Sequence, residues 1–600
     1  MSSFTISKLR LFLLFINLFI ISGVVGQSTD PVSFEIDLND LSNDTFKVVV
    51  STEGLGNKNN IFQFASTTPG TYQIQNIGRF VNDFGAFDKK GKEIKTERIS
   101  VNQFHLDNPK KIRRIEYTVS DIWDTKVDSN HVYRMRGTSI EKDHVLINGQ
   151  AVFGYFKEMQ SNPINITLNY PETWQVGTAL TKNSFGYYTA DSYDHLADSP
   201  ILLGRLSKAS TNINGTSVDI YTYSKTDKIA SNQILLSMEE MLYAADNFID
   251  GLPVDRYTFL FHFEDRSAGA SEHSYSSVYI WQEDDWEVLA KEVKNVAAHE
   301  FFHVVTPLNI HSEVIDVFNF ETPVTSDHLW LYEGTTEWAA RMMLFRSGQI
   351  SLDEYLEVLQ DKAEWSESHY DNSISLVELA RTSYTEEGQK NYGNIYEKGA
   401  LVAELLNVRL LELSKGIFGL REVIIKLSEK YGPNRPFDEK SFFKEFTNET
   451  FPEIEDFFNK YVIKADPLPY RSYFDKIGIK YIESEVSKTK SKFPYGLRLN
   501  DDKLVIHTVT EEGASNGIMK GDILISIDGE EVNMKTIYKI YGNYIDKKSG
   551  TSIQLDLQRE GQNLNIESTM IEKIDLHVFV IDPNADEEQI SLRKKWMRPL

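Results

Sequence analysis

The chain has 600 residues, of which 41% are hydrophobic and 25% are charged, so it has the composition of a globular protein and the length of several domains. Its formal net charge of −25 argues against nucleic acid or an anionic membrane as a partner, because both would repel an acidic surface. The sequence contains no cysteine, which excludes disulfides, thiol catalysis and thiolate metal sites.

The first 26 residues have the pattern of a secretory signal peptide. Lys8 and Arg10 precede an apolar run over 11–21, and small residues follow up to Gly26. The apolar run is short for a membrane span, and no later stretch is long and apolar enough to be one. We therefore expect cleavage near Gly26, a secreted or periplasmic protein, and no integral membrane span after cleavage.

Residues 27–224 predict an antiparallel β-domain. Short runs such as 34–38 and 45–50 alternate apolar and polar side chains and are separated by Gly, Asn, Asp and Pro, which is typical of strands and turns. A second unit, assigned to 225–466, begins with a helix over 230–249 and a strand over 257–263 and continues with mostly helical periodicity.

A helix predicted from 284 onward ends in His299-Glu300-Phe301-Phe302-His303. Residues four apart lie on the same side of a helix, so His299 and His303 can both turn a ring nitrogen towards one Zn²⁺. Glu300 lies beside this pair, at the place from which a general base takes a proton from zinc-activated water.

A catalytic zinc held by two histidines needs a third protein ligand, and the next predicted helix, over 325–345, offers two candidates. Glu333 lies within an apolar turn, where a carboxylate is costly to bury unless it is paired or binds a metal. Glu337 lies one turn further along the same face. It is an alternative ligand, or a carboxylate that holds a histidine N–H.

Strand patterns return over 474–577, after a linker that contains Pro467 and Pro469. The run over 514–529, with small residues, a Gly-Asp pair and a tight Asp-Gly turn, resembles a PDZ domain, whose groove takes a peptide C-terminus by strand addition. We expect either a peptide C-terminus or another part of this chain as its partner. The last segment, 578–600, is expected to form a tail docked on the surface.

The histidine motif, followed on the next helix by Leu329-Trp330-Leu331-Tyr332-Glu333-Gly334, resembles the glycyl aminopeptidase family of gluzincin zinc metallopeptidases. The resemblance implies a multidomain α+β protein with an N-terminal β-domain, a thermolysin-like, mainly α catalytic domain and a C-terminal PDZ-like β domain. It implies one Zn²⁺ per chain, held by His299, His303 and Glu333, with Glu300 as the base. The chain departs from the family over 304–311, where the family often has Trp-Asn-Val-Lys-Arg.

Two more site residues follow from the resemblance. The run Gly269-Ala270-Ser271-Glu272-His273 is similar to the family's Gly-Gly-Leu-Glu-His, which implies that Glu272 binds the free N-terminus of the substrate. The run Tyr396-Glu397-Lys398-Gly399 resembles a Tyr-x-Lys-Gly motif, which implies that the Tyr396 hydroxyl stabilises the oxyanion, with Tyr392 as the alternative.

The sequence therefore predicts a secreted zinc aminopeptidase that acts on peptides with a free N-terminus, and the family name suggests Gly or another small first residue. Two alternatives stay open. A zinc endopeptidase with the same ligands would also cleave N-blocked peptides. A PDZ-type peptide-binding protein with a vestigial metal site would hold no zinc.

Overall fold

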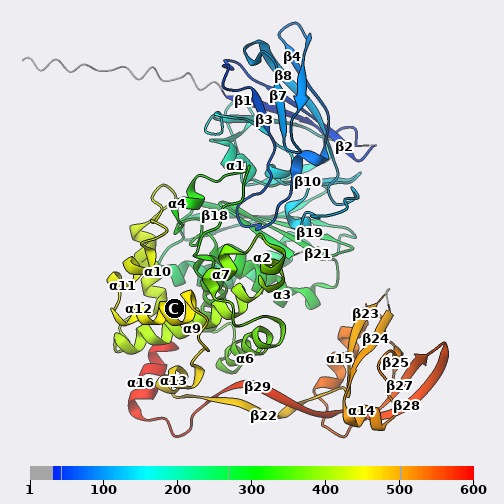
Figure 1. Ribbon diagram of the computed structural model, residues 1–600, viewed down its shortest axis with the longest axis vertical. Helices are drawn as coiled ribbons and strands as arrows, with labels where there is room; N and C mark the ends of the chain where they lie inside the picture. Colours follow the sequence, from blue (N-terminus) through cyan, green and yellow to red (C-terminus); the bar gives the residue numbers. More distant parts are fainter. Residues whose placement is uncertain (1–30, 42, 268, 501–502, 535) are drawn as a thin grey trace, which may run out of the picture.

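The computed structural model describes residues 31–41, 43–267, 269–500, 503–534 and 536–600. The predicted signal peptide, 1–26, lies outside these ranges. Figure 1 shows a β-rich part formed by the N-terminal residues, a helical lobe below it, and a smaller β unit that stands apart at the end of a long ribbon. Within the described ranges no helix combines the length and the apolar character that a bilayer span requires.

The N-terminal part is built around an eight-stranded sheet with the order β14-β15-β12-β1-β2-β8-β4-β5. Its inward side chains alternate with exposed ones, and Phe34, Val48 and Ile115 are among those in its core. Two four-stranded sheets complete this part, with the orders β13-β16-β10-β9 and β11-β3-β7-β6. The strands are β1 (Val32–Asp37), β2 (Thr45–Ser51), β3 (Ile61–Gln63), β4 (Val81–Asp88), β5 (Glu93–Ile94), β6 (Thr96–Arg98), β7 (Gln103–Leu106), β8 (Ile112–Ser120), β9 (Ser139–Ile140), β10 (His144–Ile147), β11 (Tyr155–Phe156), β12 (Ile164–Asn169), β13 (Gln175–Thr178), β14 (Thr181–Lys182), β15 (Tyr188–Ala190) and β16 (Ile201–Gly204).

One strand pairing departs from the predicted antiparallel arrangement. β1 and β12 are parallel, with Val32 opposite Ile164, whereas the other pairs of the eight-stranded sheet are antiparallel. Alternation along a strand reports that one face is buried, and it carries no information on the direction of the neighbouring strand.

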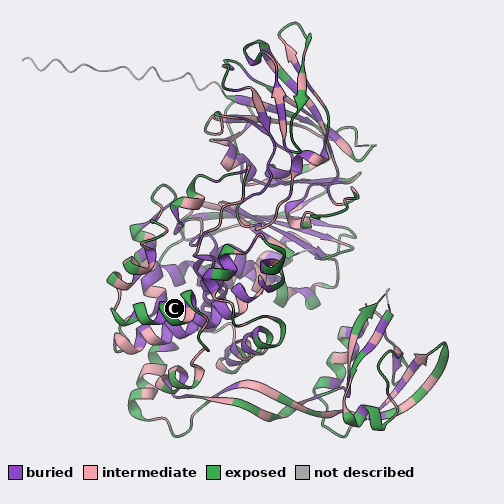
Figure 2. Cartoon of the chain, in the orientation of Figure 1, coloured by how far each residue is buried: buried purple, intermediate pink, exposed green. Residues whose placement is uncertain are grey.

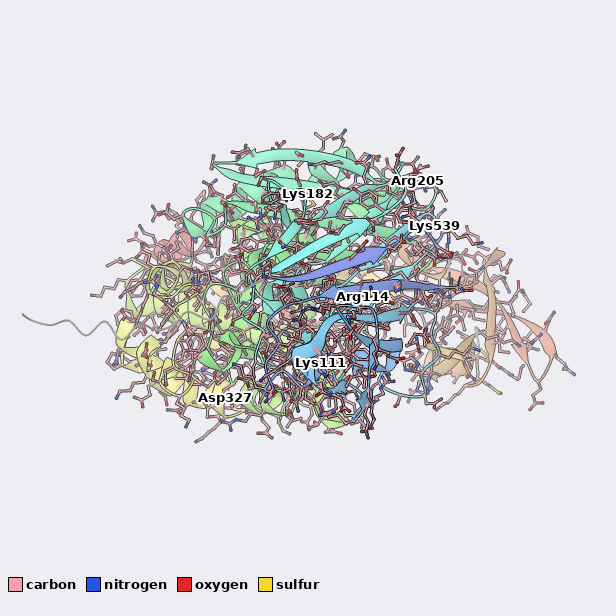
Figure 3. The ribbon with its side chains drawn as sticks, turned by 90° about the horizontal axis from the view of Figure 1, so that it is seen from above. Lys111, Arg114, Lys182, Arg205, Asp327 and Lys539 are labelled. Carbon is pink, nitrogen blue, oxygen red and sulfur yellow. The ribbon has the colours of Figure 1, made fainter. Side chains whose placement is uncertain are left out.

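Charged side chains cover the outside of the molecule. Figure 3 shows Lys111, Arg114 and Lys182 on the exterior of the N-terminal part and Asp327 at the edge of the helical lobe. Asp327 forms an ion pair with Arg381, with 2.7 Å between Oδ2 and Nη2. This distribution is that of a solvated surface, as the composition predicts.

A five-stranded sheet connects the N-terminal part to the helical lobe, in the order β17-β18-β19-β21-β20. Its strands are β17 (Ser207–Ile213), β18 (Thr216–Ser224), β19 (Arg256–Glu264), β20 (Gly269–His273) and β21 (Ser276–Gln282). β17 and β18 lie within the range predicted for the N-terminal β-domain, yet β18 pairs with β19. β19 is buried along almost its whole length because both faces of the sheet are covered. β20 forms the edge of the sheet at the helical lobe.

The helical lobe surrounds one central helix, α9 (Asn394–Leu413), whose side chains are buried on nearly all sides. Figure 2 shows that buried residues concentrate in this lobe. Around α9 lie α2 (Ser231–Ile249), α3 (Trp286–Phe302), η5 (Trp330–Gly334), α5 (Thr335–Arg346), α6 (Leu352–His369), α7 (Leu376–Arg381), α8 (Glu386–Asn391), α10 (Leu420–Lys430), α11 (Phe442–Glu449) and α12 (Glu453–Phe458).

The smaller β unit has a hydrophobic core of its own, which includes Ile506, Leu524 and Leu555. Its sheet has the order β23-β24-β25-β27-β28, and β26 pairs with β25. The elements are β23 (Tyr495–Asn500), β24 (Lys503–Val509), α14 (Glu511–Ser515), β25 (Ile523–Ile527), β26 (Glu530–Glu531), α15 (Ile537–Ile545), β27 (Ser552–Arg559) and β28 (Gln562–Thr569). The long antiparallel ribbon of β22 (Ile479–Lys492) and β29 (Ile571–Ile581) joins this unit to the helical lobe.

The segment 578–600, expected to form a tail docked on the surface, contains the helix α16 (Glu587–Trp596), whose buried residue is Trp596. Trp596 is 1% exposed, and its indole Nε1 donates to Oε1 of Glu404 over 2.6 Å. The other Glu404 oxygen accepts hydrogen bonds from Trp338 Nε1 and the Tyr355 hydroxyl, over 2.6 and 2.8 Å. After the β unit the chain therefore returns to complete the core of the helical lobe. Because charged residues surround Trp596 in the sequence, the local pattern does not predict its burial.

The Glu404 carboxyl predicts a pH dependence of stability. Burial raises its pKa from 4.5 to about 7, against the lowering effect of its three aromatic hydrogen-bond donors. A raised carboxyl pKa means that the folded state binds the proton more tightly. The contribution of this proton to the free energy of unfolding is therefore fully present below pH 4.5, and it is lost as the pH rises from 4.5 to about 7. The loss is roughly 3 kcal/mol.

Glu404→Gln keeps the shape of the side chain and cannot ionise. Between pH 4.5 and 7.5 the midpoint of thermal unfolding of the wild type should therefore fall by several degrees relative to the variant, as measured by tryptophan fluorescence. Parallel curves for the two proteins would contradict this account of Glu404.

Candidate metal centre

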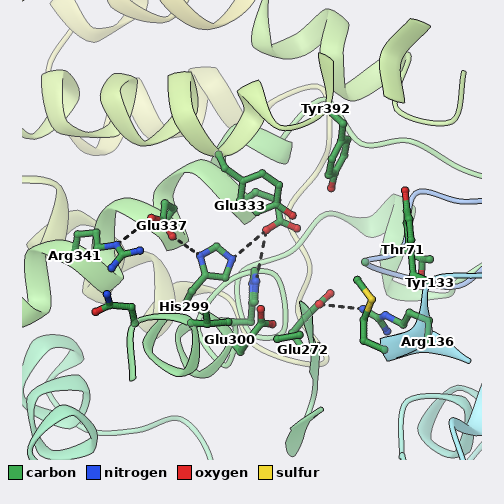
Figure 4. Close-up of a pocket in the computed structure, with 17 residues that line it drawn as sticks. Thr71, Tyr133, Arg136, Glu272, His299, Glu300, Glu333, Glu337, Arg341 and Tyr392 are labelled. Atoms are coloured by element: carbon green, nitrogen blue, oxygen red, sulfur yellow. Dashed lines mark hydrogen bonds and ion pairs between the residues drawn. The ribbon is translucent and has the colours of Figure 1, made fainter. Parts of the chain in front are cut away.

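Two histidines and one glutamate converge on a point between α3 and η5. His299 lies in the last turn of α3, His303 caps its C-terminus, and Glu333 lies in η5. The Nε2 atoms of His299 and His303 are 3.5 and 3.6 Å from Oε2 of Glu333. Figure 4 shows the His299 ring directed at this carboxylate. The structure thus brings together the three residues predicted as metal ligands.

A helix crossing holds Glu333 in this position. Its turn is π-helical and continues into α5, and π turns are frequent at functional sites. A Cβ on the next residue, Gly334, would lie 2.6 Å from the Cα of Gly399 on α9, so the two helices touch through their backbones. Tyr396 lies one turn before Gly399 on α9, so the same helix crossing brings Tyr396 close to Glu333. The glycines of the two sequence motifs thus meet at one crossing.

Hydrogen bonds orient both imidazole rings. Nδ1 of His303 is 2.9 Å from the carbonyl oxygen of Thr306, and Nδ1 of His299 is 2.9 Å from Oε2 of Glu337. Since a carbonyl or a carboxylate oxygen only accepts, both Nδ1 atoms carry the proton. In the neutral form of each ring the lone pair is then on Nε2, directed at the centre, as a metal ligand requires.

Glu337 holds a histidine and is not placed to bind the metal with Glu333. Besides His299, its carboxylate contacts Lys362 Nζ at 2.9 Å and Arg341 Nε at 3.1 Å. Burial opposes the charge of this carboxylate, but Lys362 and Arg341 outweigh it and hold the Glu337 pKa well below its usual range. Of the two carboxylates that the sequence left open, Glu333 faces the Nε2 atoms and Glu337 faces Nδ1.

The three converging residues fit a zinc ion. Tetrahedral zinc with ligand bonds of about 2.0–2.1 Å sets its ligands about 3.3–3.4 Å apart, close to the separations seen here. Oε2 of Glu333 is buried without a hydrogen-bond partner, which is costly unless a cation binds it. Burial alone would lower the pKa of His299, yet the carboxylates of Glu333 and Glu337 outweigh burial and raise it to about 10. The carboxylates therefore favour a positive charge at this point.

A second convergent group, Glu272, Glu300 and His303, fits a metal less well. Oε2 of Glu272 already accepts a hydrogen bond from Nη2 of Arg136 over 3.0 Å. An oxygen paired with a guanidinium is a poor ligand for another cation.

The residues predicted as base and oxyanion donor lie next to the centre. Glu300 is buried, and burial raises its pKa to about 8. The ring centroid of Tyr396 is 5.7 Å from that of His299. Burial would raise the pKa of Glu333, but His303, His299 and then Tyr396 outweigh burial and hold that pKa below its usual value. Burial and then the Glu333 charge raise the pKa of Tyr396 well above its usual range, so its hydroxyl stays a donor. Tyr392, the alternative donor, lines the same cavity, with 5.8 Å between its ring centroid and that of Tyr396.

These side chains line a cavity of about 260 Å³. Glu272 faces it from β20, as predicted. The N-terminal part supplies another wall, made of Gly70, Thr71, Tyr133, Met135 and Arg136.

Sequence reasoning missed several residues around the site. No motif marks Arg136, because its partners come from a distant part of the chain. Lys362 lies on the apolar face of α6 with Leu359 and Ala363, and a lysine in that position signals a buried partner. Arg341 lies four residues after Glu337 on α5, a spacing that indicates an ion pair.

Comparison with known proteins agrees with this geometry. The model of the Peptidase M61 N-terminal domain matches residues 33–205, and that of M61 glycyl aminopeptidase matches residues 292–402. An aminopeptidase N family protein from Idiomarina loihiensis has a similar structure, with a TM-score of 0.73 at 20% identity, covering 95% of this chain and 100% of its own.

Weaker similarities involve an M1 zinc metallopeptidase from Deinococcus radiodurans (TM-score 0.46, 11% identity, 73% of this chain and 94% of the other) and yeast LTA4 hydrolase (0.45, 13%, 74% and 71%). No curated protein matches the sequence. With both of its domain models matched, the chain belongs to the M61 glycyl aminopeptidase family and is a zinc metallopeptidase.

Proposed function

We propose that this zinc metallopeptidase is a secreted aminopeptidase that removes one residue from the free N-terminus of a peptide. The observation that carries the proposal is the nearness of Glu272 to the centre: one oxygen each of Glu272 and Glu300 and a ring nitrogen of His303 lie within 4.8 Å of one another. A single Cα separates the α-ammonium of a peptide from its first carbonyl. An ammonium bound at Glu272 therefore brings the first peptide bond, and no later one, to the centre.

The Gly70 backbone, which lies against Glu272, supports an exopeptidase over an endopeptidase. Gly70 has a φ of +70°, and a Cβ there would lie 1.8 Å from Oε1 of Glu272. The backbone at Gly70 thus covers the far side of the Glu272 carboxylate. The substrate of an endopeptidase would have to continue through this wall, whereas the substrate of an aminopeptidase ends in front of it.

His299, His303 and Glu333 would hold the zinc. Zinc in such a set supplies Lewis-acid chemistry, making water a stronger acid and polarising a carbonyl oxygen. Glu300 accepts the proton of the attacking water and returns it to the amine that leaves. A carboxyl whose pKa is raised to about 8 by burial suits both steps, because proton transfer is most effective when the pKa lies near the working pH.

The Tyr396 hydroxyl donates to the oxygen on which negative charge develops. The Tyr396 hydroxyl interacts with Glu333, next to the metal centre, and the helix crossing at Gly399 holds the helix that carries Tyr396. A donor that is already in place loses no free energy to reorganisation as the charge forms.

The β unit over 493–570 is proposed to be PDZ-like. β23 lies at one end of its sheet, so its outer edge is available for strand addition by a peptide C-terminus. The ribbon of β22 and β29 keeps this unit away from the catalytic cavity (Figure 1), so its partner need not be the substrate.

Replacing Glu300 separates metal binding from proton transfer. Glu300→Gln should keep its zinc, because Glu300 is not among the three ligands, and should lower kcat by about 10²–10⁴-fold through loss of the base. Glu333→Ala should instead lose much of the zinc. Zinc per chain by mass spectrometry and kcat, measured on the same preparations, check both expectations. Near-normal turnover of Glu300→Gln would remove Glu300 from the mechanism.

A peptide panel tests the proposed function. Peptides with a free N-terminus should lose their first residue, their N-acetylated counterparts should stay intact because they present no ammonium to Glu272, and a chelator should abolish cleavage until zinc is restored. Mass spectrometry of the products identifies the bond that is cut. Comparable cleavage of the acetylated peptides would show an endopeptidase, and a zinc-free protein that cleaves nothing would favour the peptide-binding alternative.

A further inference from the structure

The catalytic cavity contains an ion pair that the chemistry above does not use. Nη2 of Arg136 donates to Oε2 of Glu272 over 3.0 Å, and the two side chains are 6% and 13% exposed. Figure 4 shows the Glu272 carboxylate between the Arg136 guanidinium on one side and Glu300 and His299 on the other. Arg136 ends a short turn of the N-terminal part, whereas Glu272 lies on the edge strand β20. The substrate-binding carboxylate is thus shared between two parts of the chain.

Most donors of Arg136 are not used by protein side chains. A guanidinium has five N–H donors, and among the described residues it makes one side-chain hydrogen bond, to Glu272. Arg136 lines the central cavity and also a neighbouring cavity of about 500 Å³. The remaining donors therefore border space that a ligand can enter. A buried planar guanidinium with free donors is suited to a carboxylate, which it binds in a two-point geometry.

The pair also changes what Glu272 can bind. Opposite charges attract and like charges repel, and both effects are stronger in a buried site than in water. An α-ammonium at Glu272 is attracted by this carboxylate and repelled by the Arg136 guanidinium paired with it. A first residue whose only charge is its ammonium therefore gains little at this pair.

We propose that Arg136 is a specificity residue that selects substrates with an acidic first residue, aspartate or glutamate. Such a residue has its ammonium and its side-chain carboxylate a few bonds apart, with charges opposite to those of Glu272 and Arg136. The ammonium pairs with Glu272 and the carboxylate with Arg136. One ion pair of the free enzyme is thereby replaced by two pairs with the substrate. This inference rests on the proposed aminopeptidase function and specifies its substrate class.

The Gly70 backbone lies at the end of the cavity that holds the pair. A Cβ at Gly70 would lie 2.8 Å from Nη2 of Arg136 and 1.8 Å from Oε1 of Glu272, so the Gly70 backbone covers both charged groups. Only the first residue of a substrate reaches this end. The preference for an acidic side chain therefore applies to the residue that is removed and not to later ones. Glycine, the residue that the family name suggests, would leave Arg136 without a partner.

The test compares peptides that differ only in the first residue: Asp, Asn, Glu, Gln, Ala or Gly before a common sequence, with N-acetyl-Asp as the blocked control. Asn and Gln match the acidic residues in shape and lack their charge. The zinc-loaded wild type should show at least about 10-fold higher kcat/KM for Asp than for Asn. Arg136→Gln should bring this ratio to about one, mainly by raising KM for Asp, and Arg136→Lys should restore part of it.

Arg134→Gln is the matched control. Arg134 lies in the same turn, but its guanidinium lies over the Trp123 ring, at 5.2 Å, and it does not line the central cavity. This variant should keep the wild-type ratio of Asp to Asn cleavage.

The outcomes separate this inference from the proposed function. Cleavage of Asn and Ala peptides by the wild type as fast as of Asp peptides would overturn it and leave an aminopeptidase. An equal loss on Asp and Asn peptides in Arg136→Gln would overturn it in favour of a structural role for the pair. Failure to cleave any free peptide, or equal cleavage of N-acetyl-Asp, would overturn the proposed function as well.

Discussion

The arrangement of the catalytic lobe depends on one buried carboxylate oxygen. Oε2 of Glu333 has no hydrogen-bond partner and lies about equally far from two imidazole nitrogens. Removing such an oxygen from water without compensation costs several kcal/mol, so the fold tolerates it only where a cation completes the site. The structural features around Glu333 hold this oxygen in position. A π turn directs Glu333 inward, and backbone contact between Gly334 and Gly399 fixes that turn against α9.

Around the metal centre, each buried charge is compensated by a group of opposite charge further from the metal. Glu337 compensates the imidazole of His299, and Arg341 and Lys362 compensate Glu337 in turn. Lys362 belongs to α6, so this helix contributes to the site without reaching the cavity. In the middle of α9, Glu404 connects α5, α6 and α16 through its aromatic donors. The helix that carries Tyr396 is thus held by a polar group inside an apolar core, and such fully hydrogen-bonded groups specify one packing arrangement.

Local patterns in the sequence were sufficient for much of the site. Helical periodicity and the four-residue spacing predicted that His299 and His303 share a face, and the cost of burying a charge singled out Glu333 and Glu337. The sequence could not separate the roles of these two carboxylates, because the π turn, rather than α-helical spacing, decides which one reaches the Nε2 atoms.

Long-range relations were not accessible in the same way. The parallel pairing of β1 with β12 and the transfer of β17 and β18 to the second sheet depend on partners that a local pattern does not encode. Trp596 returns to the core from beyond the β unit, and Arg136 meets Glu272 across more than a hundred residues of chain. The pair of Arg136 and Glu272 was therefore the least predictable part of the cavity, because it is assembled from two parts of the chain.

The central claim is that zinc binds between His299, His303 and Glu333. The most direct measurement is anomalous X-ray diffraction at the zinc absorption edge from crystals of the zinc-loaded protein. The account predicts a single strong peak at bonding distance, about 2.0–2.2 Å, from Nε2 of both histidines and from Oε2 of Glu333. A peak between Glu272, Glu300 and His303 instead, or no peak at either place, would contradict it.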